Sequence, residues 1–540
     1  MFVKDTKPAK AIPKSVPVYA DGKEYIVCLK QDVDYDTFWT EMETQTSDHP
    51  NVPDRPIRIF DERPVSLRSC HYVLTDQEAV KLSSDSRVLC VELPPKHRND
   101  IVLTKHLIEN QNFDKVFSYT RSTGDNTNWG LRRVNAETNI YGIGTHALGG
   151  YEYVLDGTGV DVVIQDTGIQ ADHPEFNSPT GTNRVQQINW YSASGVSGSM
   201  PTHFYEDTQG HGTHVAGIVA GKTYGWAKNA RIYMVKVEGL TDQTGIDVPQ
   251  CFDVITGWHL NKPIDPATGY RRPTIVNASW GYGGSYSNLA GGTYRGTPWT
   301  GTLARADYGM GQGPYFPARV SAADVAVEEM IAAGVHICIA AGNNGMKIDT
   351  ETGPDWNNTW TDGIYDYAYQ QGGSPYSHTA NMIGSIDYHP LDPTRDTRAI
   401  YSEVGPGVMI YSPGTGIFSA CSTINTLALE GYAAAPYHLD SRYKQANLSG
   451  TSMASPNACG LGALALQLHP GFTPTELQQW YLTNGKHTLY STGLDDDYSN
   501  VYSVVGGDNL LIYNPYAANK SVDIAGTVNI SGPVSIKITK

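Results

Sequence analysis

The chain has 540 residues, and 39 Lys and Arg against 55 Asp and Glu leave a formal net charge of −16. This acidic balance, with no cluster of basic residues, argues against nucleic acid and an anionic membrane surface as partners. No apolar run approaches the roughly 20 residues that span a bilayer. The length exceeds what one compact core usually holds, so we expect a large domain with appendages.

Residues 1–22, MFVKDTKPAKAIPKSVPVYADG, contain lysines and prolines but no apolar stretch typical of a secretory signal peptide. We interpret them as an N-terminal arm. The odd number and scattered spacing of the cysteines favour buried free thiols in a reducing compartment; they are Cys28, Cys70, Cys90, Cys251, Cys338, Cys421 and Cys459. The sequence therefore predicts synthesis in a cytoplasm without export by the usual route.

Residues 23–95 predict a small α+β domain, because strand-like runs alternate with short helical patterns. The expected strands are 24–30, 57–60, 69–74 and 87–93, and the expected helices are 35–44 and 76–82. A polar connecting segment, residues 96–127, follows this domain.

Residues 128–505 predict an α/β domain. Apolar strand-like runs alternate there with helical ones, which indicates a parallel sheet covered by helices on both faces. The expected strands are 160–165, 231–237, 274–278, 335–341, 382–386 and 408–411, and the expected helices lie near 211–220, 248–259, 322–333 and 452–468.

Two insertions interrupt this domain, residues 282–319 and 346–377, and both are rich in Gly and aromatic residues. Both follow segments expected to border a cleft. They could form a rim that selects substrates, or they could decorate the surface and pack on a partner chain. The two interpretations are equally compatible with the sequence.

Ser452 lies in the segment SGTSMASPN (449–457), followed by an apolar stretch of small residues that predicts a buried helix. A serine at a helix N-terminus can expose its hydroxyl, and its own backbone N–H can stabilise an oxyanion. Serine is a weak nucleophile unless a base accepts its proton. The segment therefore predicts a histidine elsewhere in the chain, oriented by a carboxylate.

Both partners are present in the sequence. His211 stands in GHGTHVAGIVAG (210–221), and Asp166 ends an apolar run before Thr167 in QDTGIQADHPEF (165–176). A carboxylate at the C-terminal end of a parallel strand lies where α/β sheets collect functional groups. His214 could suggest a metal pair with His211, but no third ligand follows at metal spacing, so we expect no metal site.

The chain order Asp166, His211, Ser452 and the segments around these residues resemble the subtilisin-like serine proteases, with features of the proteinase K branch. The segments NASWG (277–281), IAAGNNG (339–345) and YSEVGPGVMIYSP (401–413) extend the resemblance. It implies that Asn343 donates to the oxyanion. It also implies that a polypeptide substrate lies along a set of five residues: Ser279, Trp280, Gly281, Ala341 and Gly342.

This resemblance also implies a role for residues 23–95, whose order of elements is similar to the subtilase propeptide, an intramolecular inhibitor. No cofactor is required for the chemistry of this family. Structural calcium is plausible by resemblance, but the calcium-binding loop that bacterial subtilisins insert after the histidine helix is missing. We assign no metal ligands.

Residues 506–540 predict a short β-rich tail, and its last part, SVDIAGTVNISGPVSIKITK (521–540), alternates apolar and polar residues. It is too short for a core of its own and predicts strands that pair with a sheet on another chain. Such a tail, together with the absence of a signal peptide and the scattered thiols, resembles in general character subtilase-like structural proteins of large tailed bacteriophages, which implies virion association. The sequence thus predicts a serine endopeptidase; the alternative is an assembly protein that keeps the fold with latent or no activity.

Overall fold

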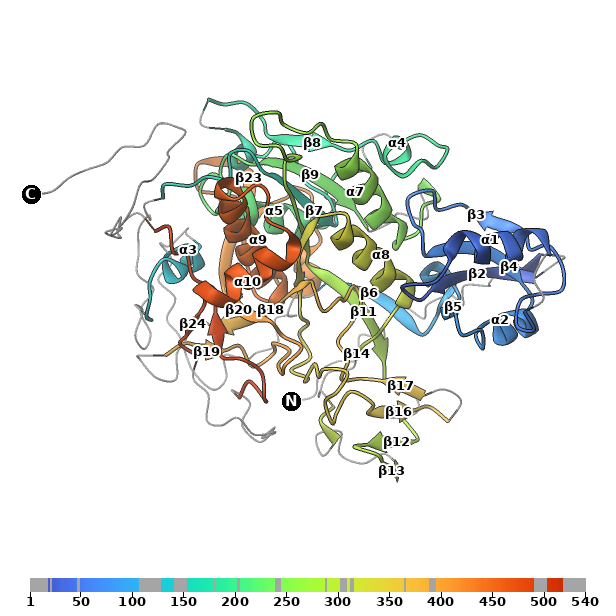
Figure 1. Cartoon of the computed structure of the whole chain (residues 1–540). Helices are drawn as coiled ribbons and strands as arrows, with labels where there is room; N and C mark the ends of the chain where they lie inside the picture. The colour runs from blue at the N-terminus through green and yellow to red at the C-terminus, as the bar shows by residue number, and fades with distance from the viewer. Residues whose placement is uncertain are drawn as a thin grey trace, which may run out of the picture.

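The structure of the protein is a computed structural model (Figure 1). It describes residues 18–19, 22–45, 49–105, 128–139, 153–178, 180–201, 204–237, 244–286, 289–301, 308–310, 315–363, 366–387, 395–489 and 503–517. The N-terminal arm, most of the predicted connecting segment and the tail from residue 518 lie outside the described residues.

A large, mostly parallel sheet forms the centre of the molecule, in the order β24-β25-β20-β18-β15-β10-β7-β9-β8 with β19 beside β18. Its strands are β7 (Asp161–Asp166), β8 (Val185–Gln187), β9 (Arg231–Lys236), β10 (Thr274–Ala278), β15 (His336–Ala340), β18 (Asn381–Asp387), β19 (Thr397–Arg398), β20 (Ile410–Pro413), β24 (Lys486–His487) and β25 (Leu510–Leu511). All residues of β7, β10, β15 and β20 are buried. This confirms the predicted parallel sheet with both faces covered.

Helices cover the two faces of this sheet (Figure 1). Helices α5 (His211–Ala220) and α9 (Thr451–Leu468) pack together on one face. Helices α7 (Gln250–Leu260) and α8 (Ser321–Ala332) pack together on the other. The remaining helical elements are α3 (Trp129–Val134), α4 (Trp190–Ser194), α10 (Pro474–Asn484), η3 (Pro174–Phe176) and η5 (Leu427–Glu430).

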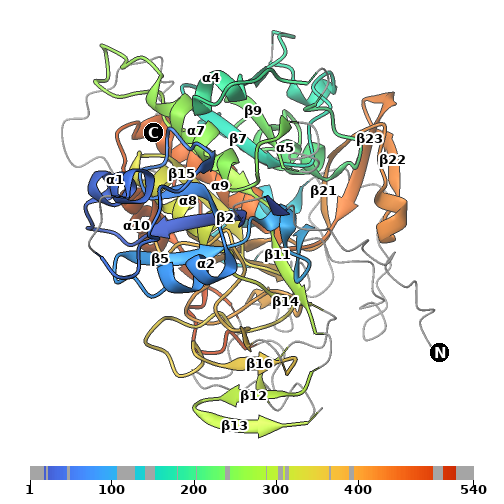
Figure 2. The same cartoon turned by 90° about the vertical axis from the view of Figure 1, so that its right-hand side faces the viewer.

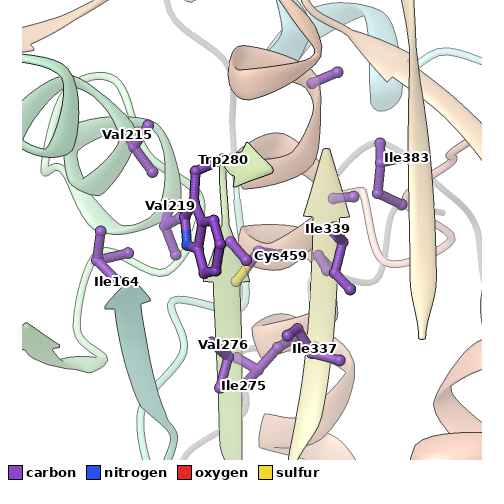
Figure 3. Close-up of a cluster of buried hydrophobic side chains, with 14 of the residues drawn as sticks. Ile164, Val215, Val219, Ile275, Val276, Trp280, Ile337, Ile339, Ile383 and Cys459 are labelled. Atoms are coloured by element: carbon purple, nitrogen blue, oxygen red, sulfur yellow. The ribbon is translucent and has the colours of Figure 1, made fainter. Parts of the chain in front are cut away.

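The hydrophobic core fills both faces of the sheet, between α5 and α9 on one side and α7 and α8 on the other. Figure 3 shows Val215 and Val219 of α5 and Cys459 of α9 facing strand residues such as Ile164 and Ile339. These side chains are at most 1% exposed. Burial of this kind contributes roughly 25 cal/mol of folding free energy per Å² of apolar surface. The core therefore fixes the positions of the helices and strands that carry the polar site residues.

The N-terminal unit is a separate antiparallel sheet in the order β1-β2-β4-β3, with β5 beside β2. Its elements are β1 (Val18–Tyr19), β2 (Gly22–Leu29), α1 (Tyr35–Thr44), β3 (Ile59–Asp61), β4 (Ser69–Leu74), α2 (Asp76–Leu82), β5 (Val88–Glu92) and η1 (Pro95–His97). One face of the sheet has its own core around Phe38, Met42 and Tyr72. On the other face, Ile26 and Cys28 cluster with residues of α8.

Strand β6 (Ile101–Lys105) lies within the segment that the sequence indicated as a polar connection. It pairs antiparallel with β11 (Trp280–Ser285), whose other edge pairs with β14 (Tyr315–Pro317). The sequence prediction missed β6 because the strand has no apolar alternation of its own. Its backbone hydrogen bonds depend on an edge almost 180 residues away in the chain.

The two predicted insertions pair with each other in one four-stranded appendage, in the order β13-β12-β16-β17 (Figures 1 and 2). Strands β12 (Gly291–Tyr294) and β13 (Thr297–Thr300) come from the first insertion, and β16 (Thr359–Thr361) and β17 (Asp366–Ala368) from the second. A further three-stranded sheet, which the sequence analysis did not predict, packs against α5. It consists of β21 (Ile417–Cys421), β22 (Ala434–Tyr437) and β23 (Asp440–Leu448).

The beginning of the predicted tail contains one strand of the central sheet. Strand β25 pairs with β20 and β24 of the chain's own central sheet. Residues 521–540, for which pairing with another chain was predicted, lie outside the described residues. All seven cysteines are free thiols, of which Cys70 and Cys90 are half-buried and the rest buried. In the described part of the chain, no helix is long and apolar enough to cross a membrane.

Candidate active site

Asp166 and His211 meet at the C-terminal edge of the central sheet. Asp166 is the last residue of β7, and His211 is the first residue of α5. His211 Nδ1 lies 2.7 Å from Asp166 Oδ1, and both side chains are buried. Because a carboxylate can only accept, Nδ1 carries the hydrogen. His211 Nε2 is buried and has no hydrogen-bond partner among the described residues, so it is the nitrogen available to accept a proton.

The start of α5 is held by Asp207, a buried residue that the sequence analysis did not single out. Its carboxylate accepts from the backbone N–H groups of Gly210 and Thr213 and from the Thr167 hydroxyl. The Thr167 hydroxyl oxygen in turn accepts from Gly212 N. One carboxylate thus fixes both the helix that bears His211 and the turn that follows Asp166. Its place four residues before His211 was the only signal in the sequence.

Ser452 is the second residue of α9, and its hydroxyl donates to the Ser279 carbonyl oxygen at 2.9 Å. The Ser279 hydroxyl returns a hydrogen bond to the Ser452 carbonyl, also at 2.9 Å. In the described part of the structure, no hydrogen bond joins Ser452 Oγ to His211. Both residues are 0% exposed, so a peptide has no access to the hydroxyl in this arrangement.

Asn343 follows β15 and lies against the residue before Ser452. Its Oδ1 accepts from Thr451 N and Thr451 Oγ1, each at 2.9 Å. Its Nδ2 is buried without a hydrogen-bond partner in the described structure. An unsatisfied buried amide costs stability, and such groups occur where a ligand or reacting atom completes them. Thr451, which orients this amide, was missed in the sequence because its role depends on a contact across 108 residues.

The five predicted substrate residues lie on two segments beside Ser452. The Trp280 side chain is only 2% exposed and packs against Phe252 and Tyr282, with ring centroids at 6.2 and 5.8 Å. Its contribution to the cleft is therefore through the backbone, which pairs with Lys105 of β6. The Gly281 carbonyl accepts from the Thr104 hydroxyl at 2.9 Å.

Ala341 and Gly342 lie on the other predicted substrate segment and are buried. Gly342 adopts a φ of +120°, which a side chain would strain, and its N–H donates to Thr451 Oγ1 at 3.2 Å. Thus both predicted substrate segments contact α9 next to the candidate nucleophile: Ser279 by its hydroxyl and Gly342 by its N–H.

His214, which the sequence suggested as a possible metal ligand, instead makes contacts that hold the fold together. Its Nε2 lies 3.1 and 3.2 Å from the carbonyl oxygens of Ile417 and Ala446, so it ties α5 to the three-stranded sheet. Burial lowers the pKa of His214 to about 3, which keeps the ring neutral. Among the described residues, no group of three or more His, Cys, Asp or Glu side chains could hold a metal ion.

A buried Asp–His pair, a serine at a helix N-terminus and an unsatisfied amide beside it define a class of protein, the serine hydrolases. The sequence profile of the subtilase family matches residues 157–501, well over half of the chain, and the chain belongs to this family. It is a subtilisin-like serine protease, a hydrolase, whose substrates are polypeptides.

Known relatives agree with this assignment. An extracellular serine proteinase of Thermus sp. (strain Rt41A) is 26% identical over 454 residues, covering 84% of this chain and 76% of that protein. Subtilisin-like protease 5 of Arthroderma benhamiae is 25% identical over 469 residues, covering 84% and 83%. The crystal structure of fervidolysin from Fervidobacterium pennivorans aligns with a TM-score of 0.50 at 17% identity, covering 95% of this chain and 66% of that one; it is similar in fold.

These relatives are bacterial and fungal proteins. They give the resemblance to bacteriophage structural proteins no support, and virion association stays a prediction from the sequence.

Proposed function

We propose that Ser452 is the nucleophile of this endopeptidase, His211 its general base and Asp166 the residue that orients the imidazole. The observation that carries the proposal is the 2.7 Å contact between His211 Nδ1 and Asp166 Oδ1, because it leaves Nε2 as the basic nitrogen. The Ser452 hydroxyl, which donates to the Ser279 carbonyl, turns toward Nε2 before it loses its proton.

The reaction then has two halves. Ser452 Oγ bonds to the scissile carbonyl carbon while its proton passes to His211 Nε2. The carbon–nitrogen bond breaks as Nε2 delivers that proton to the leaving amine, and water hydrolyses the acyl-enzyme by the same steps. Asp166 stabilises the imidazolium in both halves. Asn343 Nδ2 and the Ser452 N–H stabilise the oxyanion, and one such donor is typically worth about 3 kcal/mol of barrier.

We further propose that the N-terminal unit is an inhibitor of this site. Strand β6 pairs with β11 from Ile101 opposite Gly284 to Lys105 opposite Trp280, as an extended peptide would pair with this edge. The burial of Ser452 and His211 supports a latent state. Because Lys105 lies opposite Trp280, next to Ser279, we expect self-cleavage after Lys105 and before Asn128.

The contacts between the N-terminal unit and helices α7 and α8 support this role. Arg63 makes a bidentate ion pair with Asp253 of α7, at 2.8 Å for both hydrogen bonds. The carboxylate of Glu329 in α8 accepts from the Leu67 N–H at 2.9 Å. Glu92 accepts from the Ala322 N–H at 2.7 Å, where a carboxylate is favoured by the N-terminus of α8.

Two measurements test both proposals: the intact mass of the purified protein and its labelling by a fluorophosphonate probe. We expect the parent to lose its N-terminal unit by cleavage between residues 105 and 128 and then to react with the probe. The matched variant Ser452→Ala should keep its full mass and stay unlabelled. Labelling of Ser452→Ala would contradict the nucleophile. A parent that stays whole and yet hydrolyses peptides would contradict the inhibitor.

The appendage formed by β12, β13, β16 and β17 follows β11 in the chain, so we propose that it limits which polypeptides reach the cleft. The alternative of an assembly protein draws on the two insertions and on residues 521–540, and the latter lie outside the described residues. We propose that hydrolysis needs no cofactor, since the proposed chemistry uses only side chains and backbone. A chelator should therefore leave kcat unchanged, which a peptide-hydrolysis assay with and without the chelator checks.

A further inference from the structure

Glu403 is a fully buried carboxyl group beside the proposed oxyanion donor, and no step of the proposed reaction uses it. It lies in the segment before β20 and is 0% exposed. Buried carboxyl groups are rare unless they are paired or hydrogen-bonded, because removing a charge from water is costly. The contacts of Glu403 therefore indicate its role.

The side chain of Glu403 binds the loop that carries Asn343. Its Oε1 accepts from Asn344 Nδ2 at 2.9 Å and from Asn344 N at 3.3 Å. Its Oε2 accepts from Met346 N. The carboxyl group thus holds the loop on the C-terminal side of Asn343 through both of its oxygens.

The backbone of the same segment holds the other side of the loop. Glu403 N donates to the Gly342 carbonyl at 3.1 Å, directly before Asn343. A Cβ on Gly342 would lie 2.7 Å from Glu403 Cγ, so the loop rests on the glutamate side chain with no room for another atom. Burial raises the pKa of Glu403 to about 8, and perturbed carboxyl groups of this kind gather at functional sites.

We propose that Glu403 is a positioning residue for catalysis, which fixes the loop on both sides of Asn343 so that Asn343 Nδ2 points at the oxyanion. Thr451 fixes the other end of the same amide by donating to Oδ1. The inference rests on the proposed role of Asn343. It goes beyond that role, since it makes oxyanion stabilisation depend on a carboxyl group that does not touch the substrate.

A double-mutant cycle on the processed protein tests this inference. We expect Glu403→Ala to lower kcat about 10- to 100-fold with KM within about twofold, because a displaced donor loses part of the 100- to 1000-fold effect of one oxyanion donor. Adding Glu403→Ala to Asn343→Ala should cause little further loss, since both changes remove the same contribution. Glu403→Gln keeps an acceptor for the loop and should recover part of kcat.

Glu175 offers a matched control. It is also 0% exposed and accepts backbone hydrogen bonds, from Thr223 N at 2.8 Å and Tyr224 N at 3.4 Å. We expect Glu175→Gln to lower the melting temperature without the loss of kcat. If Glu403→Ala does not fold, Glu403→Leu, which also lacks an acceptor, takes its place in the comparison. A kcat equal to the parent's in the variant without an acceptor would overturn the inference.

Other outcomes separate this inference from the proposed function. Losses from Glu403→Ala and Asn343→Ala that multiply would mean that Glu403 acts independently of the oxyanion donor. A changed preference for the residue before the cleaved bond, with kcat retained, would assign Glu403 to substrate selection instead. If Ser452→Ala or Asn343→Ala retained full activity, the proposed function itself would fail, whatever the result for Glu403.

Discussion

The central sheet and the N-terminal unit are held in the molecule by different forces. Strands β7, β10 and β15 are buried on both faces in an apolar core. The described contact of the N-terminal unit with α7 and α8 combines a small apolar cluster with ion pairs and with hydrogen bonds to charged groups. Apolar burial is insensitive to pH and weakly dependent on salt, whereas ion pairs respond to both. The difference agrees with the proposal that the N-terminal unit is a docked inhibitor that is released from a stable peptidase domain.

Burial of carboxyl groups at this contact makes an unfavourable contribution to docking. Burial raises the pKa of Glu92 to about 7, and it also raises the pKa of Glu329. Each of these groups is less stable as an anion when docked than in water. Docking is therefore favourable only through the hydrogen bonds and ion pairs that compensate this burial, and loss of one partner should release the unit.

The largest expected effect is on peptide hydrolysis, with the stability of the central sheet and the docking of the N-terminal unit unchanged. Ser452→Ala removes the proposed nucleophile and should lower peptide hydrolysis by roughly 10⁶-fold, as for other triad residues of serine proteases. The core and the docked unit should be unaffected, because the side chain is small and contacts only Ser279 by hydrogen bonding. Turnover of a peptide substrate and the melting temperature check this. Hydrolysis within tenfold of the parent would show that another nucleophile acts.

Asn343→Ala should have the next largest effect on hydrolysis, and it should also leave the central sheet and the docked N-terminal unit unchanged. Loss of its Nδ2 donor should reduce kcat about 100- to 1000-fold with little change in KM, since the donor acts as charge develops on the oxyanion. Steady-state kinetics of the processed protein measure both constants. A rise in KM with kcat unchanged would assign Asn343 to substrate binding.

Arg63→Ala breaks the docked contact itself. Arg63 and Asp253 are 0% and 7% exposed, and removal of one member of a buried pair typically costs about 3–5 kcal/mol because the other charge stays unpaired. We expect the N-terminal unit to dissociate and fluorophosphonate labelling to accelerate about 100-fold or more. The exposed pair of Arg442 and Asp440 on β23 is the control, and Arg442→Ala should leave labelling unchanged. Equal labelling of both variants would contradict the role of the buried pair.

The smallest expected effect is on pH dependence. The pKa of Glu92 is raised to about 7 in the docked state, above the value of about 4.3 expected in water. Docking therefore takes up a proton, is strongest below that lower value, and weakens as pH rises through 7. We expect labelling to accelerate a few-fold between pH 5 and pH 8, with a smaller change in Glu92→Gln. An unchanged pH profile in that variant would show that Glu92 does not cause the effect.

Local patterns predicted much of the secondary structure. The bounds 35–44, 69–74, 76–82, 211–220 and 274–278 predicted from the sequence are those of α1, β4, α2, α5 and β10. These elements have an apolar face with the period of their own helix or strand, or are uniformly buried, and their neighbours in the chain contain turn residues. Strand β6 and the sheet of β21, β22 and β23 have no such pattern, because their partners lie far away in the chain.

The motifs around Asp166, His211, Ser452 and Asn343 were enough to identify the family and to name candidate catalytic groups, because each motif encodes its own helix start or strand end. Only the tertiary structure revealed that Glu403 and Thr451 orient Asn343, that Asp207 holds the start of α5, and that β6 occupies the edge of β11. Glu403, Thr451 and β6 make hydrogen bonds to segments remote in sequence. Asp207 holds α5 through local hydrogen bonds, and it joins that helix to Thr167, which lies 40 residues away in the chain. A side chain that serves a distant backbone leaves no periodic signal in its own neighbourhood, so its role appears only when the chain is folded.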